Sequence, residues 1–308
     1  MYDLIILGGG PAGTAAAVYA ARKHLKTAII TGDFGGQSVV SDAIYNWIGT
    51  LEISGMELAS NLKKHTLSYK GPFLDVIEGE LIIDISKTDD IIISTTESGK
   101  KYESKALLIA TGSSRRKLKA INADIFENKG ITYCASCDGP LFADQDVLVI
   151  GGGNAAFESA SQLLAYCKSV TLIHRGAEFK ADKITVTKIF ENPKFKAITN
   201  AEIIRIDGEQ FVNSLTYKDK KTNEEKTIQT TGIFVEIGQI PNTNFAKNIV
   251  EIDEFNKIVV DPMTQMTSMP GIWSAGDCTN GKYHQNNIAA GDAVKALEDA
   301  YLWIQNNK

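Results

Sequence analysis

A short apolar strand, a glycine-rich turn and a helical stretch occur twice in this chain. The first copy passes from Leu4 into Gly8-Gly9-Gly10-Pro11-Ala12-Gly13, and the second passes from Val147 into Gly151-Gly152-Gly153-Asn154-Ala155-Ala156. In such a turn the first glycine permits the sharp bend, the second lets the backbone approach a pyrophosphate, and the third small residue lets the helix pack on the strand. One copy alone is compatible with a turn that binds nothing, but two copies in the same context predict two dinucleotide sites.

The repeat predicts an α/β fold with two Rossmann-like, three-layer (ββα) dinucleotide-binding domains, the second inserted in the first. We expect residues 1–113 and 245–308 to form the discontinuous first domain and residues 114–244 to form the second. Short alternating segments are typical of β-meanders attached to each domain, at residues 80–86, 91–96, 203–207 and 212–218.

The composition is that of an ordinary globular protein and restricts the class of partner. The 308 residues carry 32 Lys and Arg against 37 Asp and Glu, for a net charge of -5. This balance does not favour a polyanion, so we expect no nucleic-acid partner. No apolar run reaches the ~18–20 residues that cross a bilayer, so we expect no membrane partner. Four cysteines are too few for a disulfide framework in a chain of this length, and Met1-Tyr2-Asp3 opens without a basic leader, so we expect a cytoplasmic protein.

The residues after the second strand of each copy bear on which nucleotide is bound. An acidic residue there normally holds a ribose 2′-hydroxyl. The first copy has Ile30-Thr31-Gly32 at this place, and we expect Asp33 to lie in the following loop. The second copy has His174-Arg175, and a cation in place of the acid suits a 2′-phosphate. The second nucleotide is therefore predicted to be the phosphorylated one.

The segment Tyr133-Cys134-Ala135-Ser136-Cys137-Asp138-Gly139 places two cysteines three positions apart. This spacing allows a small disulfide and tends to depress the pKa of one thiol, which favours thiol–disulfide exchange. A zinc site needs further ligands that neither the single Cys167 and Cys278 nor the four histidines supply at suitable spacing, so we expect no metal. An inert buried pair is the other alternative. A redox pair is the interpretation that we favour, and Cys167 and Cys278 are expected to be structural.

Two dinucleotide sites and an exchangeable disulfide imply a path for electrons. A nicotinamide gives a hydride and a disulfide takes two electrons, and a flavin connects these two chemistries. We therefore expect FAD in the first domain and a nicotinamide cofactor in the second, which also carries the cysteine pair.

Almost the whole chain resembles the low-molecular-weight thioredoxin reductases, which are class II pyridine nucleotide-disulfide oxidoreductases, and is similar to the C-terminal flavoprotein part of alkyl hydroperoxide reductase. The matching motifs are Gly8–Gly13, Thr31-Gly32 with Gly35-Gly36-Gln37, Asn46-Trp47, Ala110-Thr111-Gly112, Cys134–Gly139, Gly151–Ala156 with Glu158, Gly238 with Pro241-Asn242-Thr243, and Gly276-Asp277.

The resemblance implies an FAD-dependent, NAD(P)H-linked reductase of a thioredoxin-like protein disulfide that forms a homodimer. It implies that Cys137 faces the flavin, that Cys134 attacks the partner disulfide, and that Asp138 is a general acid–base; a turn-capping role is the alternative for Asp138. The cofactor-binding positions implied are Gly8, Gly10, Pro11, Ala12, Gly13, Thr31, Gly35, Gly36, Gln37, Asn46, Ala110, Thr111, Gly112, Gly151, Gly153, Asn154, Ala155, Ala156, Glu158, His174, Arg175, Lys180, Gly238, Gly276, Asp277, His284, Gln285 and Asn286.

The chain departs from the family pattern at two places that touch the cofactors. Where NADPH-selective members have three cations after the second strand, this chain has Arg175, Gly176 and Lys180, so NADPH is favoured while NADH is possible. Where the family has Arg-Gln-Ala near the flavin, this chain has His284-Gln285-Asn286.

Other activities remain open at this point. They are an NADH-linked reductase of a peroxiredoxin- or glutaredoxin-like partner, a dithiol oxidase that uses oxygen, and a non-catalytic FAD-binding protein. Because the nicotinamide and the cysteine pair both need the flavin, we expect the inserted domain to swivel about hinges at Ser113–Lys117 and Pro241–Phe245.

Overall fold

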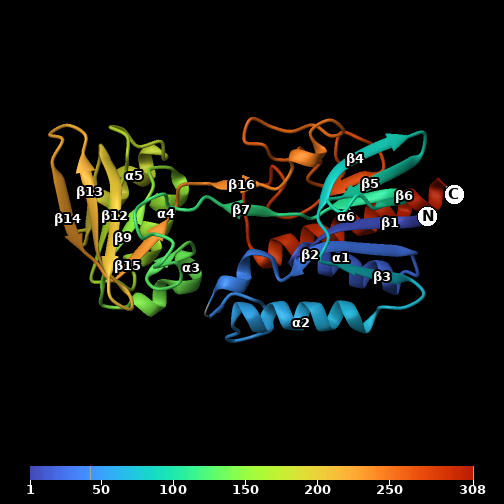
Figure 1. Ribbon diagram of the computed structural model, residues 1–308, viewed down its shortest axis with the longest axis horizontal. Coiled ribbons are helices and arrows are strands. Elements are labelled where there is room, and N and C mark those ends of the chain that lie inside the picture. Colours follow the sequence, from blue (N-terminus) through green and yellow to red (C-terminus); the bar gives the residue numbers. More distant parts are fainter. Residues whose placement is uncertain (42, 308) are drawn as a thin grey trace. The chain divides into compact units, whose positions relative to one another are not determined.

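The computed structural model describes residues 1–41 and 43–307, except for the side chains of Val40 and Cys137. The chain divides into two compact units, drawn in Figure 1. The first unit comprises Met1–Val40, Tyr45–Ser114 and Ile240–Lys308, and the second comprises Ser41–Ile44 and Arg115–Gln239. The longer segment of the second unit thus begins at Arg115 and ends at Gln239.

The first unit is built on a seven-stranded sheet with the order β3-β2-β1-β6-β5-β4, in which β17 also pairs with β6. The strands β1, β2, β3, β6 and β17 are parallel, whereas β4, β5 and β6 form an antiparallel meander. The strand bounds are β1 Tyr2–Gly9, β2 Thr27–Phe34, β3 Leu74–Glu78, β4 Ile82–Thr88, β5 Ile91–Thr96, β6 Lys101–Ile109 and β17 Ile272–Ser274.

Alternation along β1 shows why this sheet is buried on both faces. Leu4 and Ile6 pack with the alanine-rich faces of helices α1 and α6, while Ile5 and Leu7 point into a second cluster on the opposite face. The helices of this unit are α1 Pro11–Arg22, α2 Gly55–Ser68 and α6 Asn286–Asn306, with 3₁₀ turns η1 Gly36–Val40 and η3 Asn244–Ala246.

The second unit repeats this design with a five-stranded parallel sheet in the order β11-β10-β9-β15-β8. Val147 and Val149 of β9 pack against α4, whereas Leu148 and Ile150 pack against the antiparallel sheet β12-β13-β14. The bounds are β8 Ile131–Thr132, α3 Ala135–Asp138, η2 Gly139–Phe142, β9 Asp146–Ile150, α4 Asn154–Leu163, β10 Ser169–Ile173, α5 Lys183–Phe190, β11 Phe195–Ile198, β12 Ala201–Gly208, β13 Val212–Asp219, β14 Glu225–Gln229 and β15 Gly232–Val235.

Two of the segments in which the chain passes from one unit to the other pair with each other. They are β7 Ser113–Arg115 and β16 Gln239–Pro241, which form a two-stranded ribbon. The predicted α/β class and the predicted meanders are confirmed. The expectation that Asp33 lies in a loop is wrong, because β2 continues to Phe34 after a register shift in its pairing with β1.

Candidate dinucleotide and redox sites

A cavity of about 640 Å³ opens in the first unit at the carboxyl ends of its parallel strands. Its walls come from the β1–α1 turn, the end of β2, the segment after β6, residues 240–245, and the start of α6. Cofactor sites of α/β folds lie at this edge of the sheet, and the volume is within the range of small-molecule sites.

The glycine turn before α1 is closely packed at two glycines and open at the third. Gly8 has φ +110°, and a Cβ on it would lie 2.3 Å from the Ala110 carbonyl oxygen. A Cβ on Gly13 would lie 1.8 Å from the Gly8 carbonyl oxygen, so only glycine lets the helix come this close to the strand. A Cβ on Gly10 would meet nothing nearer than the Gly36 Cα at 3.8 Å. Space is therefore kept beside Gly10, where the motif requires a pyrophosphate.

The N-terminus of α1 supports an anion at the same place. Gly10 is the N-cap residue, Pro11 is the first helical residue, and no side chain caps the helix. The amide groups of the first turn are thus left to a ligand or water, and the helix dipole favours negative charge there. The open Gly10 and the uncapped helix fit a dinucleotide diphosphate, so these residues suit the cofactor that the motif predicts.

The cavity brings together most of the positions expected at the flavin site. Those that line it are Gly8, Gly10, Pro11, Ala12, Thr31, Gly36, Gln37, Ala110, Thr111, Gly112, Gly276, Asp277 and Asn286. Those of this group that lie outside the lining are Gly13, Gly35, Asn46, His284 and Gln285. Gly13 packs behind the turn instead, and the Asn46 amide donates to the Gln285 side-chain oxygen at 3.1 Å.

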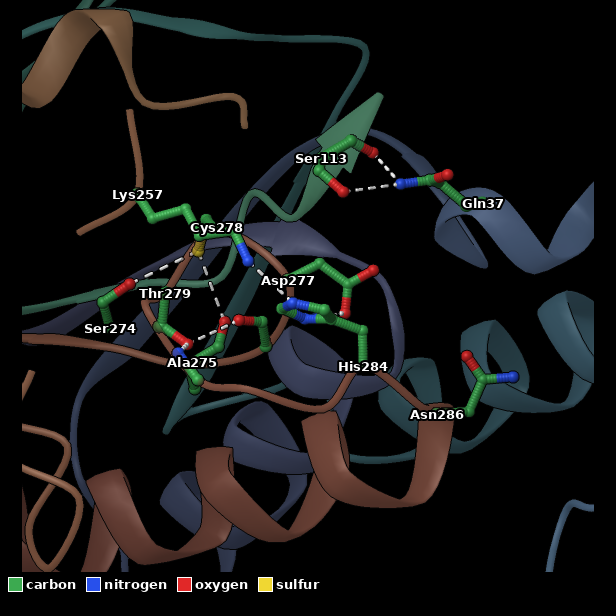
Figure 2. Close-up of polar contacts among 12 residues, drawn as sticks. Gln37, Ser113, Lys257, Ser274, Ala275, Asp277, Cys278, Thr279, His284 and Asn286 are labelled. Carbon is green, nitrogen blue, oxygen red and sulfur yellow. Dashed lines mark hydrogen bonds and ion pairs between the residues drawn. The ribbon is translucent and has the colours of Figure 1, made fainter. Parts of the chain in front are cut away.

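Side chains at one end of the cavity are connected by hydrogen bonds (Figure 2). The Gln37 amide donates to the Ser113 hydroxyl at 3.0 Å and also to the Ser113 carbonyl. The Ser38 hydroxyl donates to the Asn286 side-chain oxygen at 2.9 Å, which joins η1 to the start of α6. These bonds hold polar groups from three distant parts of the chain around one space.

Several residues of the cavity wall were missed by sequence reasoning. They are Asp33, Glu80 and the run 240–245. Lys100 and Ser98 donate to the Glu80 carboxylate, and the Lys100 bond is the main reason that the pKa of Glu80 falls to about 2. Among these residues, only Pro241-Asn242-Thr243 could have been found from the sequence, because this segment matches a motif of the resembled family, although its residue types do not indicate a cavity.

The second glycine turn has the same construction as the first. A Cβ on Gly151 would lie 2.4 Å from the Glu236 carbonyl oxygen and 2.8 Å from the Ala156 Cβ, whereas Gly153 has open space around it. No side chain caps α4, which begins at Asn154. Asn154, Ala155 and Glu158 are exposed on this helix.

The segment after β10 folds back onto this turn. The Lys180 amide donates to the Gly152 carbonyl at 2.7 Å, and the His174 Nε2 donates to the Glu178 carbonyl at 3.0 Å. The His174 ring packs directly on Gly152, where a Cβ would lie 2.2 Å from Nδ1. Burial is the main reason that the pKa of His174 is lowered; the bond to the Glu178 carbonyl opposes this shift, and the charges of Arg175 and Lys180 add to it. Arg175 and Lys180 remain exposed on this segment.

Beyond the predicted residues, a buried carboxyl group lies beside the second turn. The Ser159 hydroxyl of α4 donates to Glu236 at 2.7 Å, and burial raises the pKa of Glu236. Gly238 lies two residues further on in the same unit, where its carbonyl accepts the Arg116 amide at 3.1 Å. The expected position Gly238 is therefore part of the second unit and not of the first unit's cavity.

The cysteine motif forms a single helical turn in the second unit. Cys134 directly precedes α3, and its carbonyl accepts the Asp138 amide at 3.0 Å. The Thr132 hydroxyl donates to the Asp138 carboxylate, which fixes that side chain beside the turn. The side chain of Cys137 lies outside the described residues, so its pairing with Cys134 stays a prediction. Cys167 and Cys278 are free and buried.

Within residues 1–41 and 43–307, no group of three or more His, Cys, Asp or Glu is arranged to hold a metal ion. In the same part of the chain no helix has both the length and the apolar character needed to cross a bilayer.

Two Rossmann-like units with paired glycine turns and a Cys-x-x-Cys segment define an oxidoreductase that combines a flavin with a pyridine nucleotide. The family model for pyridine nucleotide-disulphide oxidoreductases matches residues 2–293. The chain belongs to this family and is a flavin-dependent disulfide oxidoreductase; the resemblance inferred from the motifs is thus confirmed.

Individual relatives place the chain within the family. It is 40% identical over 99% of its length to the F component of the alkyl hydroperoxide reductase of Staphylococcus aureus, and 36% identical to a Bacillus subtilis protein named NADH dehydrogenase. The chain spans only 60% and 59% of the length of these two relatives. Among solved structures, the thioredoxin reductase of Streptococcus pyogenes is similar over 99% of both chains, with a TM-score of 0.89 and 34% identity.

Proposed function

We propose that this chain passes electrons from NADPH through FAD and a Cys134–Cys137 disulfide to a thioredoxin-like protein disulfide. The observation that carries this proposal is the cavity of the first unit, whose open Gly10 and uncapped α1 suit the diphosphate of FAD. The similarity to a solved thioredoxin reductase supports the partner class. The net reaction converts NADPH, a proton and a protein disulfide into NADP⁺ and a protein dithiol.

When bound, the flavin accepts a hydride from a nicotinamide and passes the electron pair to a disulfide. The remaining steps belong to the chain's own residues. In this proposal Cys137 receives the electron pair, Cys134 attacks the partner's disulfide, and Asp138 protonates the leaving thiolate. The bond from Thr132 to Asp138 supports that role, because it orients the carboxyl group at the cysteine turn.

The second unit supplies the nicotinamide site in this proposal. Exposed Arg175 and Lys180 stand on a loop that is tied to the second glycine turn, which suits a nucleotide 2′-phosphate. The same loop exposes Glu178, which repels a phosphate, and Gly176 stands where a further cation would strengthen binding. These two residues favour a second candidate, an NADH-linked reductase of a peroxiredoxin-like partner. The names of the two curated relatives support that candidate as well.

Anaerobic titration of the purified yellow protein separates the candidates. We expect NADPH to bleach the flavin absorbance at a lower concentration than NADH, and the reduced protein to reduce thioredoxin faster than a peroxiredoxin. Preference for NADH and the peroxiredoxin would select the second candidate. A colourless protein that FAD cannot reconstitute would refute both. Peroxide formed in air at the rate of NADPH oxidation would identify an oxidase instead.

Substitution of Cys137 by Ser tests the cysteine assignment. We expect this variant to retain flavin reduction by NADPH and to lose reduction of the partner disulfide. Cys167→Ser is the matched control, since Cys167 is buried in the core of the same unit. Partner reduction at the control rate by the Cys137 variant would show that the assignment is wrong.

The proposal includes a cytoplasmic homodimer, on the strength of the resemblance. Sedimentation equilibrium of the FAD-bound protein tests the dimer, and fractionation of the producing cells tests the location. A monomer at micromolar concentration would contradict the first part.

A further inference from the structure

A lysine, a histidine and an aspartate form a chain of contacts that ends at the first unit's cavity (Figure 2). The Lys257 Nζ lies 2.7 Å from the His284 Nε2, and the His284 Nδ1 lies 3.5 Å from the Asp277 Oδ1. All three residues are half-buried, and Asp277 lines the cavity. Lys257 lies 27 positions before His284 in the chain, so nothing in the local sequence suggests their contact.

The chemistry of the three groups determines which atoms carry protons. A lysine ammonium group only donates hydrogen bonds, so the Nε2 that it contacts must accept with its lone pair. The imidazole is then neutral, with its proton on Nδ1, and this proton faces the Asp277 carboxylate. His284 thus connects a cation on one side to an anion on the other without carrying charge itself.

Lys257 is held in place by a tight turn. The Asp253 carboxylate accepts the Lys257 amide at 2.8 Å, and the Lys257 carbonyl accepts the Asp253 amide at 2.8 Å. Asn256 takes the left-handed conformation with φ 62° to close this turn. The buried Thr243, which lines the cavity, donates to the Asn256 carbonyl at 2.6 Å. The turn is therefore fastened to the cavity wall.

The residue after Lys257 ties the turn to the segment that bears Asp277. The buried Ile258 donates its amide to the Cys278 carbonyl at 2.8 Å, and its own carbonyl accepts the Asn280 amide at 3.0 Å. These bonds fix the backbone of Lys257 beside the backbone of Asp277. The lysine therefore reaches His284 from a rigid support.

We propose that Lys257 is a positioning residue of the flavin site, which sets the His284 tautomer and so holds the Asp277 carboxylate toward FAD. This inference rests on the proposed function, because it takes FAD as the occupant of the cavity.

Two measurements on the full-length protein test the proposal: the ¹⁵N NMR signature of the His284 ring and the dissociation constant of FAD from the reconstituted apoprotein. We expect wild-type His284 to show a neutral ring with the proton on Nδ1. Lys257→Met removes the donor with little change in volume, so we expect loss of this single tautomer and a dissociation constant about tenfold higher. The exposed Lys247 of the same unit provides the matched control, Lys247→Met.

Rescue variants separate positioning from a loss of packing. Lys257→Arg keeps a donor and is expected to restore most of the FAD affinity. His284→Arg in the Lys257→Met background places a cation directly beside Asp277 and is also expected to restore it. If the Lys257→Met variant folds poorly, recovery in this double variant still tests the charge argument, since it lacks the lysine as well.

The outcomes distinguish this inference from the proposed function. If the wild-type protein binds FAD and the Lys257→Met variant binds it equally well, the inference is wrong and the proposed function is unaffected. A proton on Nε2 of His284 in the wild type overturns it too. Wild-type protein that fails to bind FAD overturns the function and the inference together.

Discussion

Replacing Gly10 and Gly13 by alanine, one at a time, separates two roles of the first glycine turn: close packing of the helix on the strand, and space for the proposed FAD diphosphate. An alanine Cβ at position 13 would lie 1.8 Å from the Gly8 carbonyl oxygen, so the helix must retreat from the strand by more than an ångström. Overpacking of this kind costs ~1–3 kcal/mol, and here backbone meets backbone, so we expect the upper end of that range. The apoprotein of Gly13→Ala should therefore be clearly less stable.

Gly10→Ala should behave in the opposite way. Gly10 has φ -76°, which any residue adopts, and its Cβ would meet only the Gly36 Cα at 3.8 Å. We expect the apoprotein to be unchanged or stabilised by ~0.4–1 kcal/mol. The new methyl group occupies the place proposed for the FAD diphosphate, however. Loss of one charge-assisted hydrogen bond, ~1.5–3 kcal/mol, weakens FAD binding roughly ten- to a hundredfold.

Urea unfolding of the two apoproteins and fluorescence titration with FAD measure both quantities. The reasoning requires that the two variants separate, with Gly10→Ala losing affinity but not stability. If Gly10→Ala binds FAD as tightly as the wild type, the diphosphate does not lie beside Gly10. Equal destabilisation of both variants would refute the steric argument drawn from the contact of Gly13 with the Gly8 carbonyl.

Three further predictions follow from burial and charge. Burial raises the pKa of Cys167 to about 11 and also raises the pKa of Cys278. After mild reduction at pH 8, only two thiols, those of Cys134 and Cys137, should therefore react with iodoacetamide. Reaction of all four thiols in the folded protein would contradict this. The pKa of Glu80 is about 2 against an ordinary 4.5, mainly because of its bond to Lys100, so its ionised form stabilises the fold above pH 4.5 and this contribution disappears as the pH falls toward 2. In urea titrations, the difference in stability between the wild type and Glu80→Gln should therefore shrink over this pH window. A constant difference would contradict this role of Glu80. Lys180→Met should raise the KM for NADPH several-fold and leave that for NADH unchanged, and equal effects on both would exclude a 2′-phosphate contact.

Much of the fold could be predicted because its decisive pattern is local. In each unit the strand, the glycine turn and the helix are contiguous, so the steric needs of Gly8 and Gly151 can be inferred from a few neighbouring residues. Two such patterns were enough to predict two α/β units, and the motifs of the resembled family added part of the lining of the first cavity. The cysteine motif was equally visible, since Cys134 and Cys137 are only three positions apart in the sequence.

The prediction for Asp33 failed because strand length depends on the partner strand. The pairing of β1 with β2 shifts register between Leu7 and Gly9, so that Gly9 pairs with Phe34 and the strand continues past Asp33. A shift of this kind cannot be recognised from the residues of β2 alone, because it depends on how the neighbouring strand is aligned.

Sequence alone determined the class of this protein, its two glycine turns and its Cys-x-x-Cys motif, because each depends on residues that are near neighbours in the chain. Only the tertiary structure decided which distant residues complete the site. Examples are the wall formed by residues 240–245, the bond from Lys100 to Glu80 and the contact between Lys257 and His284, which join residues at least 20 positions apart in the sequence. Their residue types form no periodic pattern, and contact between them exists only once the sheet of the first unit and its loops have packed.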